Sequence, residues 1–101
     1  MNLARQVFHV RFGESGATVE LLQELLDRFM PNTSGRILTD ISGRDFTVVL
    51  EYEAENLMAW EQLRQRVYSD PDFGEWFQRF SDYVETSYTE LYTIEHRRDS
   101  S

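Results

Sequence analysis

The apolar residues of this chain change their spacing from one segment to the next, and the order of those changes constrains the fold more than any other feature. In residues 5–12 the apolar side chains alternate, which is the period of a β-strand. In residues 17–30 they recur every three or four positions, which is typical of an amphipathic helix. We expect Thr18 to cap that helix and Pro31 to end it, because the residue before a proline avoids helical backbone angles.

Three later segments alternate in the same way as the first. Residues 36–42 and 45–53 are separated by residues 43–44 alone, Gly and Arg, and so tight a turn predicts an antiparallel hairpin. Residues 88–95 form the last predicted strand.

Helical spacing returns between the hairpin and the last strand, over residues 56–84. Asp70-Pro71 divides this helix in two, because Asp suits a helix cap and Pro suits the first position of a new helix. The order of elements predicts an α+β ferredoxin-like βαββαβ plait, with a four-stranded antiparallel sheet in the order 4-1-3-2 and the helices on one face. We expect one domain over residues 1–101, an ordered core at about residues 5–95, and a frayed tail from residue 96 onward.

Two stretches of sequence carry a family likeness. The first covers residues 60–80, WEQLRQRVYSDPDFGEWFQRF, with Asp-Pro at the break of the second helix, and the second is ELYTIE at residues 90–95. They resemble the dimeric α/β barrel superfamily, and within it the NIPSNAP-like and antibiotic-biosynthesis monooxygenase-like small proteins. The resemblance spans Arg5 to Glu95 and implies a homodimer whose two sheets pack face to face into an α/β barrel. The sheet face left bare by the helices also carries apolar residues, such as Val7 and Val49, as an interface would.

The composition excludes several kinds of partner. Asp and Glu number 18 against 10 basic residues, all Arg, and a net charge of −8 repels nucleic acid and anionic membranes. The chain has no Cys, which excludes disulfides, thiolate metal sites and a Cys nucleophile. No apolar run approaches the roughly 20 residues that span a bilayer, and the N-terminus lacks the apolar stretch of a secretory signal. We therefore expect a cytoplasmic protein.

The candidate catalytic residues are His9, Arg11 and Glu51. His9 and Arg11 share the bare face of the first strand, and we expect Glu51 nearby on the adjacent strand. Such a group could orient a polar substrate and move a proton. The alternative, which we favour, is an Arg–Glu pair and a hydrogen-bonded His inside a dimer interface.

Three tyrosines, Tyr52, Tyr88 and Tyr92, are candidates to line the cleft between the two sheets. We expect no metal, because His9 and His96 are the only histidines and would lie about 15–20 Å apart at the rise of a strand. We also expect no cofactor, since the single glycines form no phosphate-binding loop.

An aromatic stripe follows the second half of the broken helix and suggests either a core or the pocket of a flat cofactor. Helical spacing favours the core. Trp60 and Trp76 would be its largest members, where the helix pieces meet the sheet. The stripe comprises Phe73, Trp76, Phe77 and Phe80.

Three functions are compatible with these features. The first is a homodimeric α/β barrel protein of unassigned activity that binds a small, partly apolar molecule in the cleft between the sheets. The second is a cofactor-independent monooxygenase that acts on an aromatic substrate, with His9 as the base and Arg11 stabilising the anion. The third, haem degradation, is less favoured. Members of that branch ligate haem through a His in the second helical region, and residues 56–84 contain none.

Overall fold

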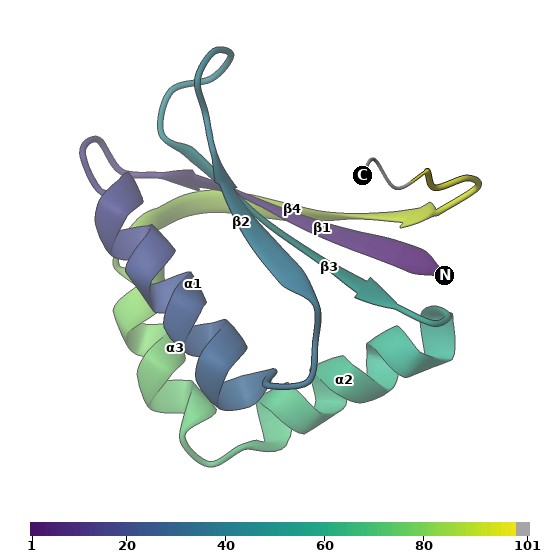
Figure 1. Cartoon of the computed structure of the whole chain (residues 1–101). Coiled ribbons are helices and arrows are strands. Elements are labelled where there is room, and N and C mark those ends of the chain that lie inside the picture. Colours follow the sequence, from purple (N-terminus) through teal and green to yellow (C-terminus); the bar gives the residue numbers. More distant parts are fainter. Residues whose placement is uncertain (99–101) are drawn as a thin grey trace.

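The computed structural model describes residues 1–98 and has the predicted ferredoxin-like α+β architecture (Figure 1). Its antiparallel sheet has the order β2-β3-β1-β4, which confirms the expected 4-1-3-2 arrangement. Residues 99–101, the end of the tail that we expected to be frayed, lie outside the described residues. No helix within the described part of the chain is both long and apolar enough to cross a membrane. The elements are β1 (Asn2–Val10), α1 (Ser15–Phe29), β2 (Gly35–Thr39), β3 (Thr47–Ala54), α2 (Leu57–Ser69), α3 (Phe73–Ser81) and β4 (Val84–Thr93).

The three helices cover one face of the sheet, and the core lies between the helices and this face. Leu22 of α1 and Leu50 of β3 are fully buried there. The two tryptophans are also buried, as predicted, and each has a hydrogen-bond acceptor. Trp60 Nε1 donates to the Tyr52 hydroxyl at 3.0 Å, and Trp76 Nε1 donates to the Leu21 carbonyl at 2.8 Å.

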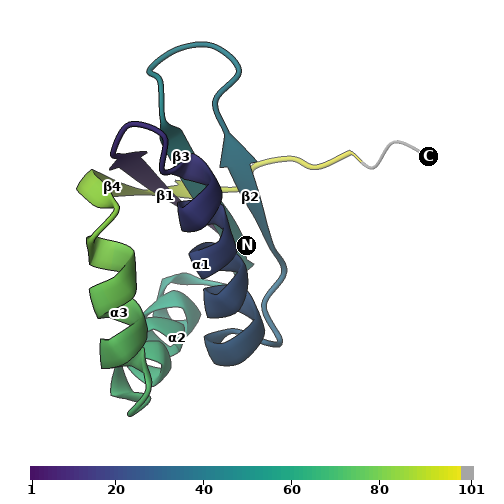
Figure 2. The same cartoon turned by 90° about the vertical axis from the view of Figure 1, so that its left-hand side faces the viewer.

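Helices α1 and α3 run side by side in both views (Figures 1 and 2). Arg79 of α3 ties them together by donating to Glu24 Oε2 of α1 at 2.6 Å. Helix α2 lies along the other end of the sheet, so the two pieces of the broken helix diverge (Figure 1). This divergence leaves part of the helix-facing side of the sheet uncovered.

The hairpin between β2 and β3 differs from the expected tight turn at residues 43–44. The strands are joined by a loop over residues 40–46 that projects beyond the sheet (Figure 1). Asp40 closes the base of this loop, because its Oδ1 accepts from the Thr47 backbone N–H at 2.9 Å. Phe46, which we placed in the strand, has a positive φ of 58° and therefore cannot continue it.

Two predicted helix caps are also wrong. Thr18 lies inside α1, fully buried, and its hydroxyl donates back to the Glu14 carbonyl at 2.8 Å. Asp70 ends α2 instead of starting the next helix. Its Oδ1 accepts from the Asp72 backbone N–H at 2.9 Å, and α3 begins only at Phe73.

Strand β4 begins earlier than predicted. Val84, which we placed at the end of a helix, pairs with Val10 across an irregularity in the ladder. The strand is at the edge of the sheet and is mostly exposed. Because its residues are mostly polar, they give little alternation for sequence analysis to detect.

Candidate functional site

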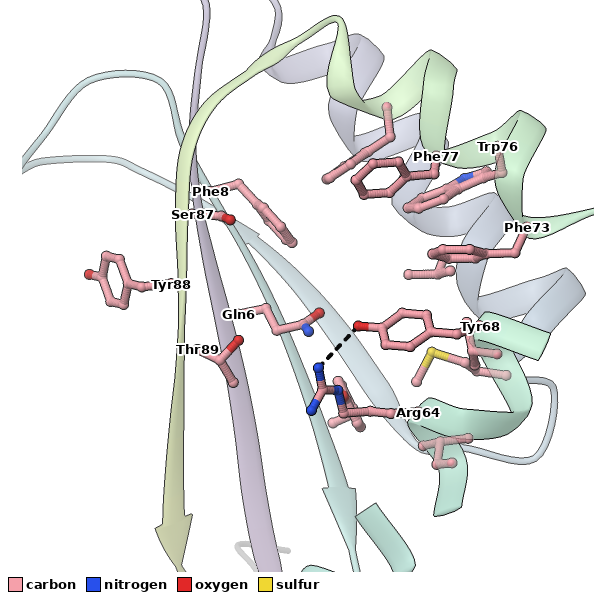
Figure 3. A pocket seen from close by; sticks show the side chains of 16 residues that line it. Gln6, Phe8, Arg64, Tyr68, Phe73, Trp76, Phe77, Ser87, Tyr88 and Thr89 are labelled. Carbon is pink, nitrogen blue, oxygen red and sulfur yellow. Dashed lines mark hydrogen bonds between the residues drawn. The ribbon is translucent and has the colours of Figure 1, made fainter. Parts of the chain in front are cut away.

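A pocket opens between the helices and the β1–β4 side of the sheet (Figure 3). Its cavity volume is about 220 Å³. An apolar cavity of about 150 Å³ is enough to hold benzene. The pocket exists because the helix-facing residues of β4 here, Ser87 and Thr89, are small and because α2 and α3 diverge in front of them.

The apolar wall of the pocket is the aromatic stripe of α3 together with Phe8 of β1. Trp76 and Phe80 stack with their ring centroids 4.8 Å apart, and Phe8 meets Phe80 edge-on at 4.9 Å. Phe73 and Phe77 extend the wall toward solvent, with centroids 5.9 Å apart. The wall therefore offers flat apolar surface to a ligand.

Our preference for core over pocket is thus right for part of the stripe only. Trp76 and Phe80 are buried members of the core. Phe77 is 50% exposed, and its ring points into the pocket (Figure 3). Helical spacing alone could not separate these roles, because the position of β4 decides which side chains remain uncovered.

The opposite end of the pocket is polar. Arg64 and Tyr68 come from α2, and Gln6 approaches them from β1 (Figure 3). The Arg64 guanidinium lies over the Trp60 ring at 4.6 Å, and its Nη2 donates a long hydrogen bond of 3.4 Å to the Tyr68 hydroxyl. That hydrogen bond raises the pKa of Arg64 above its usual value, so the group is a permanent cation.

Tyr52 forms part of the inner lining of the pocket and is 4% exposed. Burial raises the pKa of Tyr52, because the phenolate would lose its hydration, so the hydroxyl stays neutral at ordinary pH. The lining includes no His, Asp or Glu side chain among the described residues. Within residues 1–98, no three such side chains are grouped so that they could hold a metal ion.

The predicted group of His9, Arg11 and Glu51 is not brought together. His9 lies opposite Thr47 in the ladder, and its Nδ1 is 3.3 Å from the Thr47 hydroxyl. Glu51 lies further along β3 opposite Arg5, and Arg11 is exposed beyond the end of β1. The expected proximity of Glu51 to His9 is wrong, because the β1–β3 ladder pairs His9 with Thr47 and Glu51 with Arg5. A catalytic role for these residues stays a prediction.

Glu51 is instead the centre of an ion-pair cluster on the bare face of the sheet. Its carboxylate lies 3.3 Å from Arg5 Nε and accepts from Arg36 Nε at 2.7 Å. The residue is 6% exposed, and the two guanidinium groups compensate for the burial of its charge. The partners of Glu51 are therefore Arg5 and Arg36 and not Arg11, and the alternative of an Arg–Glu pair inside a dimer interface stays a prediction.

The three candidate tyrosines lie on opposite faces of the sheet. Tyr88 and Tyr92 are on the bare face, 51% and 48% exposed, as a position between two sheets requires. The Tyr88 side chain points away from the pocket (Figure 3). Tyr52 faces the helices, so its expected place in a cleft between sheets is wrong. Its position in β3 gives it the same orientation as Leu50.

Arg64 and Tyr68 were not recognised from the sequence. A signal was present, because Trp60, Arg64 and Tyr68 recur at every fourth position of one helix and therefore lie on one side of it. An Arg between two aromatic residues at that spacing indicates a stacked guanidinium.

Comparison with known proteins finds matches in structure alone. No family model and no curated protein sequence matches the chain. An uncharacterised NIPSNAP domain protein from Burkholderia xenovorans superposes with a TM-score of 0.86 at 18% identity, covering 98% of this chain and 100% of that one. A NIPSNAP family protein of unknown function from Agrobacterium tumefaciens superposes with a TM-score of 0.79 at 14% identity, over 91% and 86% of the two chains. The chain therefore shares its fold with these NIPSNAP proteins.

The monooxygenase side of the predicted resemblance is matched as well. SnoaB, a cofactor-independent oxygenase from Streptomyces nogalater, superposes with a TM-score of 0.71 at 15% identity, over 95% of this chain and 94% of that one. The resemblance to NIPSNAP-like and monooxygenase-like proteins is therefore confirmed at the level of the fold.

Proposed function

We propose that the chain binds a small, flat, partly apolar molecule in the pocket between α2, α3 and the β1–β4 side of the sheet. The observation that carries this proposal is the aromatic wall, in which the half-exposed Phe77 continues the buried stack of Trp76 and Phe80. Aromatic rings favour stacked or edge-to-face contact with a flat ligand. The ligand would then lie on the helix side of one sheet and not in the expected cleft between two sheets.

Cofactor-independent oxygenation of an aromatic substrate is the second candidate. Its support is the fold shared with SnoaB, together with a pocket that would accept such a substrate. Binding without turnover is preferred, because a general base must lie within hydrogen-bond reach of the substrate proton and His9 is on the other face of the sheet. Consumption of oxygen in the presence of a naphthol would favour the oxygenase.

Replacing Phe77 with alanine should weaken the binding of a flat probe. With 2-naphthamide, a neutral two-ring compound, we expect a loss of about fivefold in affinity, since a lost aromatic contact is worth about 1 kcal/mol. Isothermal titration calorimetry on the wild type and the variant measures this difference. Phe12→Ala is the matched control, because Phe12 is 87% exposed and does not line this pocket.

Two results would contradict the proposal. One is the absence of saturable binding to the wild type up to about 1 mM, which corresponds to a binding free energy weaker than about −4 kcal/mol. The other is equal weakening by Phe77→Ala and Phe12→Ala.

We further propose that the chain forms a homodimer through the bare face of the sheet. Tyr88 and Tyr92 supply exposed aromatic area there, beside the buried Val7 and Val49. Sedimentation at low micromolar concentration should give about twice the mass of the 12.0 kDa chain. A monomer with the circular dichroism of a folded protein would refute the dimer. A cytoplasmic location also stays a prediction.

A further inference from the structure

We propose that the pocket selects aromatic molecules that carry an oxyanion, such as a ring carboxylate, and that Arg64 binds this group. The inference rests on the proposed ligand pocket and names the class of ligand that it takes. Arg64 is the only charged side chain that lines the pocket among the described residues. A pocket with an aromatic wall at one end and a single cation at the other is complementary to an aromatic anion.

The Arg64 guanidinium retains hydrogen-bonding capacity that the protein does not use. Its Nε is buried and has no hydrogen-bond partner. Two other arginines, Arg5 and Arg79, also have a buried Nε without a well-aligned acceptor, but each of these lies within 3.3 Å of a carboxylate oxygen. Within residues 1–98 Arg64 has no such ion pair. Among the terminal nitrogens only Nη2 donates to a described residue, through the long hydrogen bond to Tyr68, so other N–H groups of the guanidinium remain for an oxyanion on the ligand.

The guanidinium is also held in place before any ligand arrives. It lies 4.6 Å above the Trp60 ring and 5.4 Å from the centre of the Tyr68 ring. Stacking on aromatic rings leaves the N–H edge of a guanidinium free, and that edge matches the two oxygens of a carboxylate. Because Arg64 is already positioned, little side-chain freedom would be lost on binding.

Neutral groups complete the polar end of the pocket. The Gln6 amide points toward Arg64 and the Tyr68 hydroxyl (Figure 3), and Thr89 is its neighbour on β4. Amide and hydroxyl groups can donate to the outer lone pairs of an oxyanion. The chain as a whole has a charge of −8, so its overall field repels anions. If the protein nevertheless binds an anion more tightly than a neutral analogue, the difference must come from a local contact such as that with Arg64.

The test compares two ligands of nearly equal shape, 2-naphthoate and its neutral amide, 2-naphthamide. In 0.15 M salt we expect the wild type to bind the carboxylate about tenfold more tightly, which corresponds to about 1.4 kcal/mol. In Arg64→Gln this preference should disappear while the affinity for the amide changes little. Arg66→Gln is the matched control. Arg66 is an exposed residue of the same helix outside the pocket, and its substitution removes the same charge.

Each outcome is decisive. Equal binding of both ligands to the wild type would overturn the anion proposal and leave the proposed ligand pocket intact. Binding of neither ligand would overturn both proposals. If Arg64→Gln weakens both ligands equally, Arg64 shapes the pocket without recognising the anion, and the proposal is wrong. If Arg66→Gln also loses the preference for the carboxylate over the amide, the preference arises from the net charge of the protein, and the proposal is overturned.

Discussion

Replacement of Trp76 with alanine is expected to lower the free energy of unfolding by about 3–5 kcal/mol, the usual range for truncating a buried large aromatic side chain. Trp76 is 3% exposed and stacks on Phe80 between α3 and the sheet. Its indole N–H donates to the Leu21 carbonyl of α1, so the substitution also breaks a hydrogen bond between two helices. Urea denaturation followed by circular dichroism measures the change.

Phe12→Ala serves as the control for this measurement, because Phe12 is 87% exposed and its truncation should change stability by less than about 0.5 kcal/mol. A change below about 1 kcal/mol for Trp76→Ala would show that Trp76 is not part of the core.

Replacement of Leu50 with alanine is expected to cost about 2–5 kcal/mol. Leu50 is fully buried in β3, one of the two central strands, where helices cover it and neighbouring strands flank it. Such a site cannot collapse around the lost methyl groups, and a cavity remains. Denaturant unfolding of the variant measures the loss.

Leu91→Ala is the matched control. Leu91 faces the same side of the sheet but lies in the edge strand β4 and is 41% exposed. Its truncation should cost about 1 kcal/mol or less, because less apolar area leaves contact on truncation. Equal losses for the two variants would contradict the assignment of the core to the β3 side of the sheet.

The element order and sheet topology followed from local spacing in the sequence. The alternation of apolar residues predicted β1 and β3, and their helical spacing predicted α1 and α2. The ferredoxin-like order of these elements then predicted which strands are neighbours. The errors arose where tertiary contacts override local signals. Phe46 continues an apolar pattern yet belongs to a loop, and Val84 continues a helical pattern yet pairs with Val10.

The candidate site was less accessible from the sequence. Gln6, Arg64 and Thr89 are far apart in the chain and line one pocket only because β4 pairs with β1 and α2 diverges from α3. The β1–β3 register that separates His9 from Glu51 was also not predictable, because alternation shows which face of a strand a residue occupies but not which residue lies opposite it. Aromatic spacing on α3 predicted a buried face but not that one ring would border an open space.

The position of the ligand is tested most directly by intermolecular nuclear Overhauser effects between bound 2-naphthamide and the protein side chains. Binding in the helix-side pocket predicts contacts from the naphthalene protons to the rings of Trp76 and Phe77. Contacts to Tyr88 and Tyr92 instead would place the ligand on the opposite face of the sheet and contradict the proposed site.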